Sequence, residues 1–507
     1  MKDTVASYSV EIVARAVRHG ERVAIVDGEG EVSYHDLVAA AHRAADCLLA
    51  NGADLAGARV ALLAPPGRDY VIAQWGTWLA GGVIVPLCLT HPLAEMAYMV
   101  GDAEVSVIVA HPQFEAMARE LAATRSVRVV STLEFRADSV RAGRLPEVGA
   151  NQRAMIIYTS GTTGKPKGVV TTHRNIAAQI TALIDAWEWR PGDRILHVLP
   201  LHHLHGVINV LGCALWAGAV CEMHARFEAR AVWERIARGG LTLFMAVPVI
   251  YQRLIAQWDE ANPEERAMLT RAASALRLMV CGSAALPVPV FEKWREVSGQ
   301  FLLERYGMTE IGMALSNPLH GPRLPGTVGV PLSGVLVRLV DEAGAVIEAD
   351  DQPGEIEVAG PAVFLEYWRR PAETLAAFHE GWFRTGDIAR RRVGIYAILG
   401  RNSVDIIKTG AYKVSALEIE HELLAHPAIE ECAVVGVPDD EWGERVCAVI
   451  NWRGGAGLSL EELRAWCKER LAVYKVPSRV LSNVPLPRNA LGKVTKKDVQ
   501  ALFKCTP

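Results

Sequence analysis

Short apolar runs alternate with helical patterns through the first 330 residues, and this alternation restricts the possible folds more than any other feature. Three of the runs are RVALLA at residues 59–64, VSVIVA at residues 105–110 and VRVVS at residues 127–131. Runs of this kind are typical of buried parallel strands that are connected by helices. The sequence therefore predicts an α/β fold with parallel strands in this part of the chain.

The pattern changes from about Gly326, where short alternating strands and frequent glycines follow one another. This change predicts an antiparallel, barrel-like part. A compact tail with helix and strand patterns of its own comes last, and 507 residues are too many for a single core. We therefore expect an N-terminal domain over residues 1–400 and a small C-terminal domain over residues 401–507.

A loop rich in Gly, Thr and Lys, YTSGTTGKPKGV at residues 158–169, directly follows a strand-like apolar run. Its glycines let the backbone approach a ligand closely, and its hydroxyl and ammonium groups can converge on a polyphosphate. It differs from the common G-x-x-x-x-G-K-[ST] nucleotide loop, because Pro166 follows Lys165. A surface hairpin is the alternative, but a linker has no need for this composition after a buried strand. The candidate phosphate-binding residues are Thr159, Ser160, Gly161, Thr162, Thr163, Gly164 and Lys165.

The segment ERYGMTE at residues 304–310 offers a second set of nucleotide-binding groups. Tyr306 could stack on a base, Thr309 could donate to a phosphate, and Glu310 could hold Mg²⁺. Magnesium prefers one or two carboxylates together with phosphate oxygens. A helix that begins here, with the glutamate in its first turn, is the alternative interpretation.

Asp387 ends the segment WFRTGD, where it follows a glycine. A carboxylate in such a position can accept hydrogen bonds from both hydroxyls of a ribose. The alternative is an ordinary solvated aspartate in a turn.

Two later segments complete a recognisable series, namely GRNSVDIIKTGAYK at residues 400–413 and PRNALGK at residues 487–493. In this order the motifs resemble the adenylate-forming superfamily of acyl- and aryl-CoA synthetases, peptide-synthetase adenylation domains and firefly-type luciferases. The resemblance begins at SYHDL, residues 33–37, and so covers nearly the whole chain. It implies a large N-terminal part with two α/β subdomains and a small β-barrel, plus a small, mobile α+β C-terminal domain.

The resemblance implies a two-step reaction that uses ATP, Mg²⁺ and CoA. A carboxylate attacks the α-phosphate of ATP to give an acyl-adenylate and pyrophosphate, and a thiol then displaces AMP. Glu310 would bind Mg²⁺, and Asp387 and Arg401 would bind the ribose. The expected catalytic residues are Lys493, Glu310, Thr163 and Lys165. The residues expected around the rest of the nucleotide are Gly282, Ser283, Ala284, Tyr306, Gly307, Met308 and Thr309.

The resemblance also implies that the C-terminal domain rotates between the two steps, about a hinge at Ser403. Lys493 would then leave the site, and a loop would face the channel for CoA. Two positions depart from the family pattern, because the hinge is usually Asp or Lys and a glycine is expected at Ala411. The extra methyl group either narrows the channel or selects a slightly different backbone. The expected channel residues are Lys408, Gly410, Ala411 and Lys413.

The acyl pocket implied by the resemblance lies beside PLHHLHG at residues 200–206. Arg305 is unusual there, because many relatives carry a small or neutral residue at this place. A guanidinium beside an acyl pocket favours a second carboxylate on the substrate. The alternative is that Arg305 pairs with Glu304 or another carboxylate and only shapes the wall. The expected pocket residues are His203, His205, Arg305 and, as a second candidate cation, Arg226.

The segments LFMAVPVIYQRL and LLERYGMTEIGMALS closely resemble those of malonyl-CoA synthetases. This resemblance implies a malonate–CoA ligase that also tolerates methylmalonate. Two alternatives stay open: a short- or medium-chain fatty acid–CoA ligase, and an adenylating enzyme that loads a carrier protein.

The composition gives no reason to expect nucleic acid as a partner, since the net charge is only −4. Nine scattered cysteines without a C-x-x-C pair, and no secretory signal, predict reduced thiols and a cytoplasmic location. The apolar stretches 70–89 and 206–223 contain Gly pairs or polar breaks, so we expect no membrane span. The expected partners are therefore small-molecule substrates, and the oligomeric state is not predicted.

Overall fold

The computed structural model describes residues 8–50, 52–123, 125–136, 144–159, 165–402, 404–409, 412–439, 442–454, 457–488 and 494–503. Several predicted site residues lie outside these ranges, namely Ser160, Gly161, Thr162, Thr163, Gly164, Ser403, Gly410, Ala411 and Lys493.

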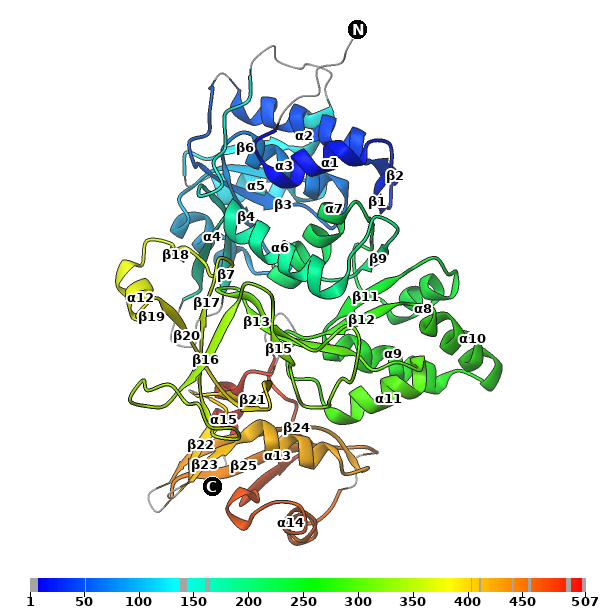
Figure 1. Cartoon of the computed structure of the whole chain (residues 1–507), viewed down its shortest axis with the longest axis vertical. Coiled ribbons are helices and arrows are strands. Elements are labelled where there is room, and N and C mark those ends of the chain that lie inside the picture. The colour runs from blue at the N-terminus through cyan, green and yellow to red at the C-terminus, as the bar shows by residue number, and fades with distance from the viewer. Residues whose placement is uncertain are drawn as a thin grey trace.

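A seven-stranded sheet, counted over the described residues, includes β7 and β8, the two strands that flank residues 160–164 (Figure 1). Its order is β18-β8-β7-β4-β3-β5-β6, and the pairs from β7 to β6 are parallel, whereas β8 is antiparallel to β7 and β18. The strands are β3 (Arg59–Leu63), β4 (Val83–Pro86), β5 (Val105–Ala110), β6 (Arg128–Ser131), β7 (Arg153–Thr159), β8 (Lys167–Thr172) and β18 (Glu366–Tyr367). Helix α2 (Tyr34–Leu49) precedes these strands, and the helices between them are α3 (Arg68–Leu79), α4 (Leu93–Asp102) and α5 (Glu115–Ala122).

A second, nine-stranded sheet in the described part of the chain has the order β15-β14-β13-β12-β11-β9-β10-β1-β2. Its central strands, from β13 to β1, are parallel. The strands are β1 (Val23–Asp27), β2 (Gly30–Ser33), β9 (Arg194–His197), β10 (Val220–Met223), β11 (Leu243–Ala246), β12 (Leu278–Cys281), β13 (Leu303–Met308), β14 (Gly312–Ser316) and β15 (Val330–Pro331). The accompanying helices are α1 (Glu11–His19), α6 (His173–Trp187), α7 (Cys213–Ala217), α8 (Ala229–Ala237), α9 (Pro248–Glu260), α10 (Pro263–Ser274) and α11 (Val288–Ser298).

The two sheets confirm the predicted α/β fold with parallel strands. One apolar core joins both of them, because residues such as Ile84 of β4, Trp187 of α6 and Phe244 of β11 belong to the same buried cluster. The helix-start interpretation of ERYGMTE is wrong, since these residues form β13 and a turn. The apolar stretch 70–89 forms α3 and β4, and no helix in the described ranges is long and apolar enough to cross a membrane.

The glycine-rich region after Gly326 folds into a small antiparallel sheet, in the order β16-β17-β20-β19 with β21 on β20. Helix α12 (Pro371–Ala376) precedes β19. The prediction of an antiparallel part is thereby confirmed. Its strands are β16 (Leu336–Val340), β17 (Gly354–Ala359), β19 (Phe378–His379), β20 (Trp382–Arg392) and β21 (Ile395–Arg401).

The last part of the chain forms an α+β unit with apolar clusters of its own, at the end of the molecule far from α1 and α2 (Figure 1). The preceding strand, β21, ends at Arg401, and the first strand of the new sheet begins at Ile406. The domain boundary between residues 400 and 401, which falls just before the end of β21, stays a prediction. The elements are β22 (Ile406–Thr409), β23 (Tyr412–Ser415), α13 (Ala416–Leu424), β24 (Ile429–Asp439), β25 (Gly443–Trp452), α14 (Leu460–Lys468), β26 (Arg479–Ser482) and α15 (Lys496–Leu502).

Candidate functional site

Asp387 and Arg401 face each other across two paired strands and form a polar cluster with Tyr306. Strand β20 carries Asp387 and strand β21 carries Arg401, and the two residues are direct partners in the sheet register. Arg401 Nε donates to Asp387 Oδ1 at 2.9 Å, and the hydroxyl of Tyr306 donates to Asp387 Oδ2 at 2.6 Å. Asp387 is 8% exposed, so it is not a solvated turn residue. Three residues that the sequence placed around a nucleotide are thus brought together.

Glu310 is buried in the turn after β13, and its carboxylate has a partner that sequence reasoning missed. The hydroxyl of Tyr367 in β18 donates to Glu310 Oε1 at 3.0 Å. Burial raises the pKa of Glu310, and this hydrogen bond acts in the opposite direction. A strand of two residues gives no periodic signal, so the sequence pattern could not place Tyr367 beside Glu310.

The two ends of the predicted phosphate loop are firmly attached, although residues 160–164 lie outside the described ranges. Thr159 ends β7 and Lys167 begins β8, and these residues are partners in an antiparallel pair. The Nζ of Lys165 lies 5.2 Å from the ring centre of Tyr98, whose hydroxyl donates to the carbonyl of Pro166 at 3.0 Å. The loop therefore connects two neighbouring strands, β7 and β8, of the seven-stranded sheet.

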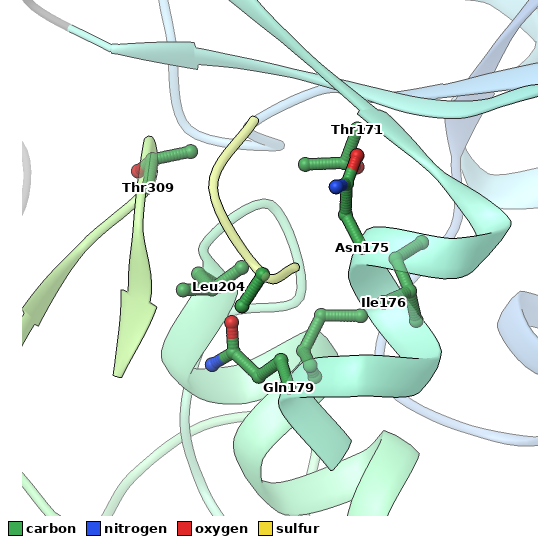
Figure 2. A pocket seen from close by; sticks show the side chains of 8 residues that line it. Thr171, Asn175, Ile176, Gln179, Leu204 and Thr309 are labelled. Atoms are coloured by element: carbon green, nitrogen blue, oxygen red, sulfur yellow. The ribbon is translucent and has the colours of Figure 1, made fainter. Parts of the chain in front are cut away.

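Gly282, Ser283 and Ala284 follow β12, and Tyr306, Gly307 and Met308 end the neighbouring β13. A Cβ atom on Gly307 would lie 2.1 Å from the carbonyl oxygen of Gly312, so this hairpin needs a glycine. Thr309 follows directly and faces a small cavity, with Thr171 and side chains of α6 opposite it (Figure 2). The residues that line this cavity are Thr171, Asn175, Ile176, Gln179, Leu204, Ile208, Thr309 and Ala362.

Arg305 is buried and has no ion pair within the described residues. It is 3% exposed, and its one side-chain hydrogen bond goes from Nη2 to Ser283 Oγ at 3.4 Å, while Nε has no partner in that part of the chain. Burial lowers the pKa of Arg305 to about 10. The guanidinium lies against Gly282, where a Cβ atom would come within 2.5 Å of Nη1.

Glu304 does not neutralise Arg305, although the two are neighbours in β13. Side chains of successive strand residues point to opposite faces. Glu304 Oε1 accepts a hydrogen bond from the backbone N–H of Leu286 at 3.1 Å. Burial raises the pKa of Glu304 to about 8. The alternative of a Glu304–Arg305 pair is therefore wrong.

His205 lies next to Arg305 and begins a π-helical segment, His205–Gly212. Its Nδ1 is 3.2 Å from Ser283 Oγ, and its Nε2 has no hydrogen-bond partner among the described residues. Burial, and next the charge of Arg305, lower the pKa of His205 well below its usual value. Ser283 has a positive φ of 70°, a strained conformation that is often found at functional sites. Sequence reasoning placed Ser283 beside the nucleotide, whereas its hydroxyl contacts two predicted acyl-pocket residues.

The other predicted pocket residues lie in two different settings. The rings of His202 and His203 are 4.1 Å apart, and burial lowers the pKa of His203 to about 4. Arg226 instead lies at the surface, where its side chain is 83% exposed and Nη2 is 2.6 Å from Glu228 Oε1. The structure does not bring Arg226 together with Arg305.

Two of the four predicted CoA-channel residues lie in the described ranges, as partners in the β22–β23 hairpin. Lys408 of β22 faces Lys413 of β23 in the register. Lys408 is exposed, and its backbone N–H donates to Glu444 Oε2 at 2.7 Å. The next residue after the undescribed turn, Tyr412, stacks on Tyr474 with a ring separation of 4.0 Å.

The chain is similar in sequence and in structure to several proteins that have been named. The chain is 45% identical to malonate–CoA ligase ACSF3, mitochondrial, of Homo sapiens, over 96% of this chain and 91% of that protein. It is 41% identical to malonate–CoA ligase of Arabidopsis thaliana, over 88% of this chain and 78% of that protein. The solved structure of ATP-bound MatB from Rhodopseudomonas palustris is 34% identical, with a TM-score of 0.90, over 98% of this chain and 99% of that one.

The expected cytoplasmic location is wrong by the same comparison. The similar proteins of Xenopus laevis, Homo sapiens, Bos taurus and Mus musculus are all named mitochondrial. Reduced thiols do not distinguish between compartments inside a cell, so the composition could not decide this point.

Two family descriptions account for most of the sequence. The AMP-binding enzyme family matches residues 12–368, and the C-terminal domain of AMP-binding enzymes matches residues 418–493. These matches confirm the resemblance to adenylate-forming enzymes that the motifs indicated. Together with relatives that align over nearly the whole length, they show that this chain belongs to the AMP-binding enzyme family.

Proposed function

We propose that this protein is a malonate–CoA ligase, which joins malonate to CoA at the expense of ATP and releases AMP and pyrophosphate. One observation carries the choice of acid. A buried guanidinium, that of Arg305, has no carboxylate partner in the described chain and lies beside the nucleotide motifs. The names of the human and Arabidopsis relatives support the same acid.

The reaction has two steps that balance. In the first, a carboxylate oxygen of malonate forms a bond to the α-phosphorus of ATP, and pyrophosphate leaves. In the second, the sulfur of CoA attacks the carbonyl carbon of malonyl-adenylate, the thiol loses its proton, and AMP leaves. Both steps move negative charge, so preorganised cations and N–H donors should supply most of the stabilisation.

On the nucleotide side, the carboxylate of Asp387 accepts hydrogen bonds from the ribose hydroxyls, and Arg401 holds this carboxylate in place. The contacts support this role, since Oδ1 accepts only from Arg401 Nε at 2.9 Å among the described residues and keeps a lone pair for a hydroxyl. Oδ2 accepts from Tyr306 at 2.6 Å and from Arg401 Nη2 at 3.4 Å. The loop from Thr159 to Lys165 surrounds the β- and γ-phosphates. Lys493 contacts the α-phosphate and the attacking carboxylate, a role that rests on the motif PRNALGK.

A magnesium ion fits the residues present. Glu310 is one buried carboxylate with one oxygen fixed by Tyr367, and Mg²⁺ is commonly held by one or two carboxylates plus phosphate oxygens and water. The described residues contain no group of three or more His, Cys, Asp or Glu that would hold a metal alone. A bound Mg²⁺ would neutralise phosphate charge, and Glu310 would position it.

On the acyl side, Arg305 binds the carboxylate of malonate that does not react. A charge-assisted hydrogen bond contributes about 1.5–3 kcal/mol. A monocarboxylic acid leaves the guanidinium without a partner in a buried place, so the site should discriminate strongly against it. Methylmalonate keeps both carboxylates, and we propose that it is accepted as well.

The two predicted domains have separate tasks in this scheme. Residues 1–400 bind ATP and the acid, and residues 401–507 supply Lys493 for the first step. Rotation about Ser403 then brings the hairpin with Lys408 and Lys413 to the channel for CoA. The change of sheet between β21 and β22 supports a boundary at this place.

A panel of acids tests the proposed function. Pyrophosphate release and AMP formation are measured with malonate, methylmalonate, propionate, butyrate and octanoate, each with CoA present and absent. We expect turnover with the first two acids and little with the others. Equal turnover with butyrate would indicate a fatty acid–CoA ligase instead. Transfer to a pantetheine carrier protein but not to free CoA would indicate a carrier-loading enzyme.

A further inference from the structure

The hydroxyl of Tyr367 is the one side-chain donor to Glu310 among the described residues. It lies 3.0 Å from Glu310 Oε1, and both side chains are less than a tenth exposed. Phe364 packs edge-on against the tyrosine ring, with the ring centres 4.7 Å apart, and its backbone N–H donates to the carbonyl of Glu310 at 2.7 Å. The carboxylate and the main chain of Glu310 are therefore both hydrogen-bonded to the segment 364–367.

The same segment is joined to the end of the phosphate loop. Tyr367 is the direct partner of Val169 in the pair of β18 with β8. The ammonium group of Lys167, the first residue of β8, lies 5.2 Å from the centre of the Tyr367 ring and forms an ion pair with Glu373. The backbone N–H of Trp368 donates to the carbonyl of Gly168 at 2.8 Å. The segment 364–368 thus contacts Glu310, the proposed magnesium ligand, and β8, the strand that follows the phosphate loop.

We propose that Tyr367 is a positioning residue, which fixes the carboxylate of Glu310 in register with the phosphate loop so that both hold Mg·ATP together. The inference rests on the proposed function, because that function makes Glu310 the magnesium ligand. Tyr367 itself does not touch the ion or the nucleotide in this account. It acts through Glu310, whose second oxygen stays available.

A positioning residue is needed because a carboxylate without a hydrogen-bond partner can adopt several rotamers. A glutamate side chain has three rotatable bonds, and a hydrogen bond to one oxygen selects the rotamer that presents the other. Partners of this kind behind a metal ligand typically change metal affinity by about 10–100-fold when they are removed. The ammonium group of Lys167 adds a second link, since it lies over the ring of the same tyrosine.

The variant Tyr367→Phe tests the inference, because it removes the hydroxyl and keeps the ring that packs on Phe364 and faces Lys167. Calorimetry measures the affinity for ATP with excess Mg²⁺ and for ATP in EDTA. We expect the dissociation constant of Mg·ATP to rise by about 10-fold and that of metal-free ATP to change less than about twofold.

Tyr396→Phe is a matched control. Tyr396 is also buried, at 3% exposure against 9% for Tyr367, and its hydroxyl donates to the carbonyl of Val337 at 3.5 Å, in the small sheet. This variant should bind both forms of ATP as the wild type does. Both variants are compared with the wild type by thermal unfolding, so that a general loss of structure is recognised.

A double variant decides whether Tyr367 acts through Glu310. In the background Glu310→Ala, the change Tyr367→Phe should have no further effect on Mg·ATP binding. An additive effect, equal weakening of both forms of ATP, or no weakening at all would each overturn the inference. If the wild type binds Mg·ATP but forms no AMP with any acid, the proposed function fails, whereas these binding measurements still decide the role of Tyr367.

Discussion

The nucleotide side and the acyl side of the site are built from similar residues but differ in how their polar groups are satisfied. Asp387 is buried, and both of its oxygens accept hydrogen bonds, Oδ1 from Arg401 and Oδ2 from Tyr306 and Arg401. Arg305 and His205 are equally buried, yet each has a ring or guanidinium nitrogen without a partner in the described chain. A buried donor left unpaired costs about 1–3 kcal/mol. The difference indicates that the first cluster is a fixed frame, whereas the second one needs a ligand to be complete.

In the proposed function Lys493 contacts both the α-phosphate and the attacking carboxylate. Removal of its side chain should therefore give the largest loss of activity, and the loss should be the same for every acid. Lys493→Ala should slow adenylation by about 10²–10³, the usual loss for one charge-stabilising donor. Thioester formation from preformed malonyl-adenylate should be spared. Pyrophosphate release and single-turnover thioester formation measure the two steps separately. Equal loss in both steps would refute the assigned role.

Gly282→Ala should harm the acyl side selectively. The added Cβ atom would lie 2.5 Å from Nη1 of Arg305, so the guanidinium must move. We expect kcat/KM for malonate to fall by about 10–100-fold, which corresponds to one or two charge-assisted hydrogen bonds, and turnover of propionate to change little. Gly192→Ala is the control, because nothing lies within 4 Å of its added atom. Equal loss with both acids would show that the alanine disturbs β12 as a whole.

Asp387→Asn should affect the nucleotide side with every acid. The amide keeps the shape, but it removes the charge that Arg401 and Tyr306 engage. We expect the KM for ATP to rise by about 10-fold, the lower end for charged hydrogen bonds, with the ratio of malonate to propionate turnover unchanged. Steady-state kinetics at varied ATP measure this. A change in the acid preference would contradict the separation of the two sides.

The last prediction concerns stability and pH at Glu304, and no loss of turnover at neutral pH is expected from it. Its pKa is raised to about 8 in the folded chain from 4.5, so between these values the folded state keeps a proton that the unfolded state has lost. The free energy of unfolding should therefore fall as pH rises from 4.5 to 8, by at most about 1.4 kcal/mol per pH unit from this group. Urea unfolding of wild type and Glu304→Gln at several pH values isolates the contribution. Parallel pH curves would show that Glu304 is ionised.

The fold and the identity of the motifs could be predicted from the sequence because they depend on local patterns. Valine-rich runs with helices between them specify parallel sheets, and YTSGTTGKPKGV, ERYGMTE and WFRTGD each lie in one continuous segment. The pairing of Asp387 with Arg401 follows from a hairpin whose two strands are neighbours in sequence.

The remaining features depend on contacts between distant segments, which a single sequence does not reveal. Tyr367 contacts Glu310 across 57 positions, and Ser283 joins His205 across 78 positions. The surface position of Arg226 could not be deduced either. Residues 224–227, HARF, follow a strand, and such a segment is compatible with a pocket and with a solvated turn. Arg305 could be singled out from the sequence alone, because many relatives carry a small or neutral residue at this place.

The central claim is that the guanidinium of Arg305 binds the second carboxylate of the acid. The most direct test compares kcat/KM for malonate and for propionate in the wild type and in Arg305→Ala, by pyrophosphate release. The account predicts that the substitution lowers kcat/KM for malonate by at least about 100-fold and changes kcat/KM for propionate by less than about threefold. The preference for malonate over propionate would then be largely lost. Loss of the same size with both acids would contradict the claim and leave Arg305 with a structural role only.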